Sequence, residues 1–442
     1  MKIKIKTLLF FVVLLLALYQ DFPLVNIFGE IARSPIIFLT IPMLIYILMH
    51  QKLILSKYTR YFMYYILYVL IISLIFIPIV YYLNGSFLII KENIILKAIK
   101  LFVYPLSILI FYQFVYMLFS SGKNSFDYFF NAVFTLQVLL AVYLFFEVIF
   151  LKKETIFASF LHSDNLKYYR VRLLTLEESW IGTVLTIFIF IPIFLANYLK
   201  KPKKIKQKIY AFSTFIFLYY TFFSESKGYL LLIIVSVLPM AIQYMYSHNK
   251  LRKVLFVGSP IILIIAVFVV MILQKTIDDQ LHTSITFGTR LTSYLASLKV
   301  FITHPFGVGW SGFIYYYPEA IRDIINTSWV STLNLQEIKG YLTTTKALST
   351  KTDFFDNLMY GGLGFIVFFY NFFIKRYFFF SKFRDTNFFF IKAPLLFCIL
   401  AGLIYITFYI KYEVWFLMAF LDALQSQINN KISKENENTY SS

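Results

Sequence analysis

Arginine and glutamate side chains occur close together in the polar stretch that precedes residue 180. Arg170 and Arg172 are two residues apart, and Glu177 and Glu178 follow them. A guanidinium group binds phosphate oxygens through a planar fork, so two arginines on an extended segment could hold a diphosphate. A glutamate here could orient the arginines or accept a proton from a sugar hydroxyl. The alternative is that these groups only anchor a helix end at the membrane interface and pair locally.

A further cation, Lys227, lies in the short turn Ser224–Gly228 between two apolar segments. Gly228 can adopt backbone conformations that other residues avoid, and the ammonium group of Lys227 offers a point charge to a phosphate. Taken alone, however, the turn is more typical of an ordinary helical hairpin.

Three more candidates belong to a polar interval late in the chain. Arg290 stands at the start of a predicted helix, where backbone N–H groups add to anion binding. His304 could act as a base near neutral pH or bind a sugar, although it could equally cap the end of that helix. We predict that the catalytic base is His304 or Glu177, with Asp353 as the next candidate.

No spacing typical of a metal site occurs in the sequence, which lacks His-x-x-x-His, Asp-x-Asp and Glu-x-x-His. A metal-dependent transferase at a membrane surface would usually need such carboxylates, so we predict a metal-independent protein. The single cysteine, Cys398, lies in an apolar run and can form no internal disulfide.

The elements that must position these residues are membrane helices. The chain has 442 residues, 60% of them hydrophobic and 14% charged, and its mean hydropathy is +0.74. Apolar runs of about 20 residues can cross a hydrocarbon core of about 30 Å as helices, which pair their own backbone groups. We therefore predict an all-α, polytopic integral membrane protein with about 12 transmembrane helices. The predicted spans are 7–24, 31–49, 61–83, 98–119, 128–151, 180–198, 209–223, 229–246, 254–273, 355–374, 388–408 and 413–427.

Basic residues are concentrated in the predicted cytoplasmic connections. Six lysines lie between residues 200 and 208, whereas the external connections at 25–30, 84–97, 224–228 and 409–412 contain fewer basic residues, with Lys91 and Lys97 as the main exceptions. By the positive-inside rule, this asymmetry places both termini in the cytoplasm. It also accounts for most of the net charge of +19, so we predict no nucleic-acid partner.

The interval 274–353 forms a long external loop between the ninth and tenth predicted helices. Structureless loops above about 15 residues are usually functional or disordered, so this one is unlikely to be an idle connection. Apolar residues recur in it at helical spacing and predict an amphipathic surface helix from Arg290 to Thr303, which stops at His304 before Pro305. The recurring residues are Leu291, Leu295, Leu298 and Ile302. We expect one transmembrane domain, 1–428, and a disordered cytoplasmic tail, 429–442.

In this order, these features resemble the O-antigen polymerase and O-antigen ligase group of membrane glycosyltransferases. The shared features span about residues 170–364 and comprise Arg170, Arg172, Glu177 and Glu178 before the sixth helix; the turn Ser226-Lys227-Gly228; Arg290 followed by the His-Pro-x-Gly-x-Gly run His304–Gly309; and Gly361 and Gly364 in the next helix. The resemblance implies a GT-C-like fold.

The resemblance also implies an activity: joining oligosaccharide repeat units, carried on undecaprenyl diphosphate, at the outer face of the bacterial cytoplasmic membrane for O-antigen or capsule synthesis. Donor and acceptor would both be lipid-linked, and an acceptor hydroxyl would displace the lipid diphosphate with inversion, without metal ion, cofactor or nucleotide sugar. Preorganised cations would stabilise the leaving group; these would be Arg170, Arg172, Arg290 and Lys227. A chain-length regulator and a flippase are the expected protein partners.

Two alternatives differ from polymerase in testable ways. Ligases of this group resemble one another in a His-Asn type pair nine residues before the Gly-x-x-Gly, where this chain has Thr350 and Lys351. The missing histidine favours polymerase over a ligase-type transferase. A polysaccharide flippase or transporter would typically show repeated halves and ionisable groups near the bilayer midplane, whereas no repeat is visible here and the charges cluster outside.

Overall fold

The computed structural model describes residues 4–50, 55–122, 124–152, 159–163, 170–223, 226–247, 284–344 and 348–440. These residues are almost entirely helical, and two-residue strands β1 (Leu88–Ile89) and β2 (Glu92–Asn93) form one antiparallel hairpin. The principal helices before the long polar interval are α1 (Ile5–Leu18), α3 (Thr40–Met49), α4 (Lys57–Asn84), α5 (Ile94–Ser120), α6 (Ser125–Lys152), α7 (Ile181–Tyr198), α8 (Lys203–Phe223) and α9 (Lys227–Ser247). The principal helices within and after that interval are α11 (Ile285–Thr303), α12 (Gly309–Ile325), α13 (Gln336–Gly340), α14 (Asp353–Phe369), α15 (Lys375–Ser381), α16 (Phe389–Ile404) and α17 (Tyr412–Tyr440).

Among the described residues, six helical segments are long and apolar enough to cross a membrane: Lys57–Asn84, Ile94–Ser120, Ser125–Leu151, Glu178–Tyr198, Asp353–Ser381 and Thr386–Ile404. They confirm the prediction of an all-α, multi-pass membrane protein. Shorter apolar helices occupy Ile5–Leu18, Pro35–Met49 and Gly228–Pro239. The predicted spans 209–223 and 413–427 fall within α8 and α17, and 254–273 lies outside the described residues. The number twelve therefore stays a prediction.

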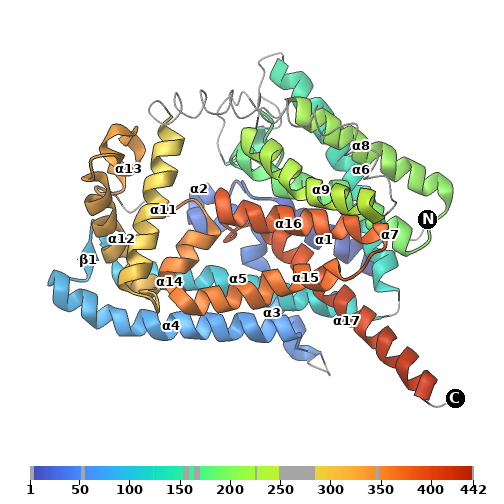
Figure 1. Cartoon of the computed structure of the whole chain (residues 1–442), viewed down its shortest axis with the longest axis horizontal. Coiled ribbons are helices and arrows are strands. Elements are labelled where there is room, and N and C mark those ends of the chain that lie inside the picture. Colours follow the sequence, from blue (N-terminus) through green and yellow to red (C-terminus); the bar gives the residue numbers. More distant parts are fainter. Residues whose placement is uncertain are drawn as a thin grey trace.

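The interval predicted as a long loop contains helices that lie across the others. In Figure 1, α11 and α12 run roughly perpendicular to α4 and cover its end next to β1. The helix predicted at 290–303 is present and ends where expected, with His304 as its C-terminal cap. It begins earlier, at Ile285, because the side chain of Ser284 caps it by accepting a hydrogen bond from Phe287 N at 3.3 Å.

The buried face of α11 consists mainly of small residues. Small and hydroxyl-bearing residues such as Gly288, Thr292 and Ala296 pack inward, whereas Ile302 is 75% exposed. A Cβ atom at Gly288 would collide with the carbonyl oxygen of Asn334. Small residues allow this close helix packing, which leaves the larger apolar side chains facing outward.

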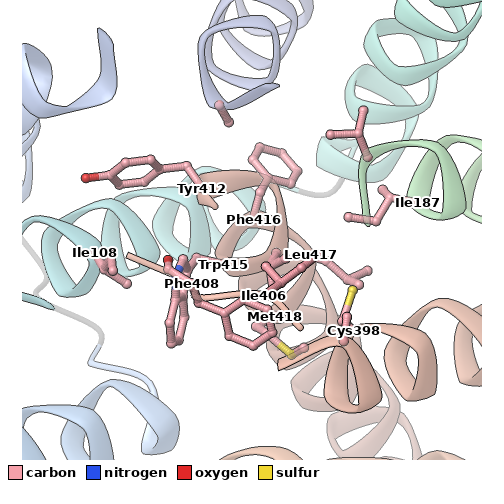
Figure 2. Packing of buried hydrophobic residues seen from close by; sticks show 14 of the residues in the cluster. Ile108, Ile187, Cys398, Ile406, Phe408, Tyr412, Trp415, Phe416, Leu417 and Met418 are labelled. Carbon is pink, nitrogen blue, oxygen red and sulfur yellow. The ribbon is translucent and has the colours of Figure 1, made fainter. Parts of the chain in front are cut away.

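The start of α17 is embedded in the centre of the bundle. Figure 2 shows Tyr412, Trp415 and Phe416 surrounded by side chains of other elements, including Ile108 and Cys398. Because α17 packs along α5 and also contacts α1 and α7, the connection that leads into it, residues 405–411, is held firmly in place. At its other end, α17 continues to Tyr440, so residues 429–440 are helical where the sequence predicts disorder. The lysine and glutamate residues there are good helix formers, and extending an existing helix needs no new nucleus.

Candidate functional site

The connection between α16 and α17, residues 405–411, is the meeting point of several helix ends. The first turn of α14 holds it through Asp353, whose backbone N–H donates to Ile406 O at 2.9 Å and whose Oδ1 accepts from Phe408 N at 3.1 Å. The indole of Trp415 donates to Phe408 O at 2.9 Å. Asp353, a predicted catalytic residue, is buried and binds the backbone of this connection.

Arg290 reaches the same connection from α11. Its guanidinium carbon lies 5.8 Å from the ring centroid of Tyr405, and the arginine is only partly buried. Gly182 and Gly228 also face Tyr405, because Cβ atoms added there would lie 3.1 Å from its hydroxyl and 3.8 Å from its ring. The first turns of α7 and α9 therefore converge with Arg290 on one tyrosine. A cation together with helix N-termini favours the binding of an anion.

The hydroxyl of Tyr405 is buried without a hydrogen-bond partner among the described residues. Lys227, the other predicted cation of this turn, is the first residue of α9 and directly precedes Gly228; its side chain lies outside the described part of the structure.

Lys411, at the far end of the connection, is fully buried beside a polar network. Its Nζ lies 4.2 Å from the ring centroid of Trp180 and donates to Gln20 Oε1. The amide of Gln20 donates to Glu413 Oε2 at 2.8 Å, and Thr183 Oγ1 donates to Glu413 Oε1 at 2.8 Å. Burial lowers the pKa of Lys411 to about 7, although the charges of Glu413 and Glu177 oppose this shift.

Lys411 and Glu413 were not among the sequence candidates. The connection is short and contains only one basic residue, so charge counting assigns it no role. The only available signal was a lysine and a glutamate two residues apart, immediately before an apolar segment.

Glu177 lies at the edge of this network. It is exposed, directly precedes the 3-10 turn Glu178–Trp180 that leads into α7, and is close enough to Lys411 and Tyr341 to interact electrostatically with both. The structure thus brings together three of the predicted site residues, Arg290, Glu177 and Asp353, around residues 405–411.

The two predicted diphosphate arginines before α7 differ in their surroundings. Arg170 is exposed, whereas Arg172 is 4% exposed and its Nη1 lies 3.7 Å from Asp21 Oδ2. Asp21 also contacts His162 Nδ1 at 2.8 Å, and the backbone N–H of Arg172 donates to Glu147 Oε1 at 2.8 Å. A buried guanidinium needs such a carboxylate. The prediction that both arginines grip one diphosphate is not supported for Arg172, which is part of a buried ion-pair network.

His304 lies at the opposite end of α11 from Arg290. Fourteen residues separate them, which corresponds to about 21 Å along a helix. The imidazole packs at 4.4 Å from the Tyr316 ring and 5.9 Å from the Phe76 ring, and its Nδ1 lies 2.9 Å from Thr303 Oγ1. Burial lowers the pKa of His304. The structure therefore does not bring His304 to the cluster around Tyr405.

Asp356 is a further carboxylate of α14, three residues after Asp353. It is fully buried, and its Oδ1 accepts a hydrogen bond from Thr350 N at 2.7 Å. Its Oδ2 has no hydrogen-bond partner among the described residues. The buried Tyr317 and Tyr360 and the partly buried Tyr409 lie within electrostatic range of it. An acidic residue one helical turn after Asp353 was the only sign of it in the sequence.

Within the described residues, no group of three or more histidine, cysteine or acidic side chains could hold a metal ion. The arrangement instead offers cations, helix N-termini and single carboxylates, a combination suited to binding an anion and moving a proton. No protein family and no curated protein matches the chain.

Proposed function

We propose that this protein is a polysaccharide polymerase that joins oligosaccharide repeat units carried on undecaprenyl diphosphate at the outer face of the bacterial cytoplasmic membrane. The observation that carries the proposal is the convergence of Arg290 with the first turns of α7 and α9 on Tyr405. Helix N-termini and a guanidinium group attract the same ligand, an anion such as diphosphate. The sequence order of the motifs supplies the substrate class.

In the proposed reaction, Arg290 binds the diphosphate of the donor, and Lys227 adds a second charge from the start of α9. An acceptor sugar hydroxyl attacks the anomeric carbon of the donor, a carbon–oxygen bond forms, and the bond from that carbon to the diphosphate oxygen breaks. The lipid diphosphate leaves with the electron pair. The cations stabilise the negative charge that develops on it.

Glu177 is the base that this geometry favours for the proton of the acceptor hydroxyl. It is exposed and lies in the cluster, whereas His304 is about 21 Å along α11 from Arg290. Asp353 is engaged with the backbone of Phe408. Of the two arginines before α7, Arg170 is the one that solvent reaches, so it remains a proposed diphosphate ligand, and Arg172 supports its segment through Asp21.

Incubation of the purified protein with a lipid-linked repeat unit tests the proposal. A ladder of longer lipid-linked products is the expected outcome. Transfer only to a different acceptor would identify a ligase-type transferase, and movement of the substrate across liposomes without any new bond would identify a transporter. Arg290→Lys should abolish the ladder because a single ammonium group cannot replace the bidentate fork. Lys299→Arg, on the exposed face of the same helix and paired with Asp323, is the matched control.

A further inference from the structure

A groove lined by tyrosines lies between α4 and α14. Its volume is about 480 Å³, within the range of about 300–1,000 Å³ that is usual for small-molecule sites. Four tyrosines of α4 form one wall, and Phe306 and residues 363–371 form the other. We call it the tyrosine groove; its α4 residues are Tyr61, Tyr64, Tyr65 and Tyr68.

One end of the groove, at Phe306, is built by the His304–Gly309 segment. This segment packs against the break in α14 at Gly362. Val308 N donates to Met359 O at 2.9 Å, and Leu363 N donates to Pro305 O at 2.8 Å. Gly362 has φ +50° and Gly307 has φ +88°, values that side chains disfavour, and a Cβ atom at either would collide with backbone of the other segment. Each segment thus satisfies backbone groups of the other.

The hydroxyls of the two tyrosines next to this junction are engaged in hydrogen bonds within the protein. Tyr68 donates to Phe306 O at 2.9 Å, and Tyr65 donates to Asn357 Oδ1 at 2.9 Å. Their rings therefore present carbon to the groove. Leu363 and Val367, on the opposite wall, are exposed and apolar. The lining is suited to a hydrocarbon chain and offers little to a sugar or a phosphate.

We propose that the tyrosine groove binds the polyprenyl chain of the lipid-linked substrate, an inference that rests on the proposed function. Both walls belong to segments long enough to cross a membrane, so the groove is open to the hydrocarbon of the bilayer. Asn357, the partner of Tyr65, adjoins Asp356 and lies one turn after Asp353. Leu363 follows Asp353 by ten residues and lies just past the break in α14 at Gly362. A chain whose diphosphate lies beside Arg290 reaches the groove by running down α14.

Photo-crosslinking tests this proposal without requiring turnover. The photoreactive residue p-benzoylphenylalanine is placed at position 363 in the groove or at position 71 on α4, which is more exposed but does not line the groove. The full-length protein is reconstituted in phosphatidylcholine liposomes containing a minor fraction of undecaprenyl phosphate. We expect several-fold more polyprenyl adduct at position 363 than at position 71 by mass spectrometry. Equal labelling at both positions, or phospholipid adducts alone at position 363, would overturn the proposal.

A kinetic variant separates this proposal from the function on which it rests. Leu363→Trp fills the groove and should raise the KM for the lipid-linked repeat unit several-fold while kcat is retained, whereas Ile71→Trp should change neither. If Leu363→Trp left KM unchanged in a protein that makes polymer, the groove assignment would be wrong and the polymerase would stand. Polyprenyl crosslinking at position 363 in a protein that forms no polymer would support the groove assignment and contradict the proposed polymerase activity.

Discussion

At its first turns, α11 carries Arg290 to Tyr405, at one end of the connection 405–411. Asp353 binds the middle of this connection, and the buried Lys411 lies at its other end. At its last turn, the same helix delivers His304 into aromatic packing and the glycine-rich segment that locks onto α14. Both ends contain residues that suit catalysis by type. Their surroundings differ. Charged side chains lie near the first turns, whereas aromatic rings and backbone hydrogen bonds to α14 surround the last turn. A side chain capable of chemistry indicates a site only where its neighbours supply the complementary groups.

The largest expected effect is at the charged end. Arg290→Ala should lower the polymerisation rate by about 10²–10³-fold, the usual effect of removing one preorganised donor to a developing negative charge. Rates are measured on purified protein with lipid-linked repeat units, alongside the melting temperature. Lys299→Ala should retain the rate. An Arg290→Ala protein with an undiminished rate would remove this end of α11 from the site.

The close contact between Gly362 of α14 and the segment 304–309, at the other end of α11, should contribute to the stability of the folded protein. Gly362→Ala places a Cβ atom against the carbonyl oxygen of Pro305 at φ +50°, so we expect a loss of about 2–3 kcal/mol in folded-state stability. The readout is the melting temperature in detergent together with membrane abundance. Gly340→Ala is the control, since a Cβ atom there meets nothing within 4 Å. Equal melting temperatures for the two variants would show that the contact between Gly362 and the segment 304–309 does not stabilise the fold.

Lys411 makes the charged end sensitive to pH. Its pKa in the folded protein is lowered to about 7 from an ordinary value of 10.5, so the unfolded chain binds more protons than the folded one between these values. Stability should therefore increase as the pH rises from 7, by about 2 kcal/mol at pH 9. Melting temperatures across pH 7 to 9 measure this slope, and Lys411→Met should flatten it. The same slope in both proteins would mean that Lys411 remains protonated in the fold.

The smallest effect is expected at His304. His304→Phe keeps a ring against Tyr316 and Phe76 and removes only the imidazole nitrogens, so the polymerisation rate should change by less than about 5-fold. Glu177→Gln, measured in parallel, should lower the rate by about 10²–10⁴-fold as the loss of a general base. The opposite ranking of these two variants would move the base to the C-terminal end of α11.

Local sequence signals predicted the elements well where one physical factor dominates. The apolar runs that became α4, α5, α6 and α7 are long enough that no other structure satisfies their backbone in lipid. The end of α11 at His304 followed from Pro305, which disfavours helix before it. The leucine periodicity predicted the helix, but its buried face depends on tertiary packing, because the close approach of Asn334 requires glycine at position 288.

The candidate site was predicted only in part. Arg290 and Glu177 were found because helix starts and arginine-rich motifs are local patterns. Lys411 was missed because its burial depends on Gln20 and Trp180, which are distant in sequence. Arg172 was assigned to the diphosphate because its ion-pair partner, Asp21, lies some 150 positions earlier in the chain.

By itself, the sequence determined that the chain is a multi-pass helical membrane protein and where most of its apolar helices lie, because hydropathy and helix-breaking residues act over a few turns. Only the tertiary structure decided which charged side chains are buried, which are exposed and which share a cluster. Electrostatic and packing energies depend on distances in space between α7, α9, α11, α14 and residues 405–411, and those distances are set when the helices pack together.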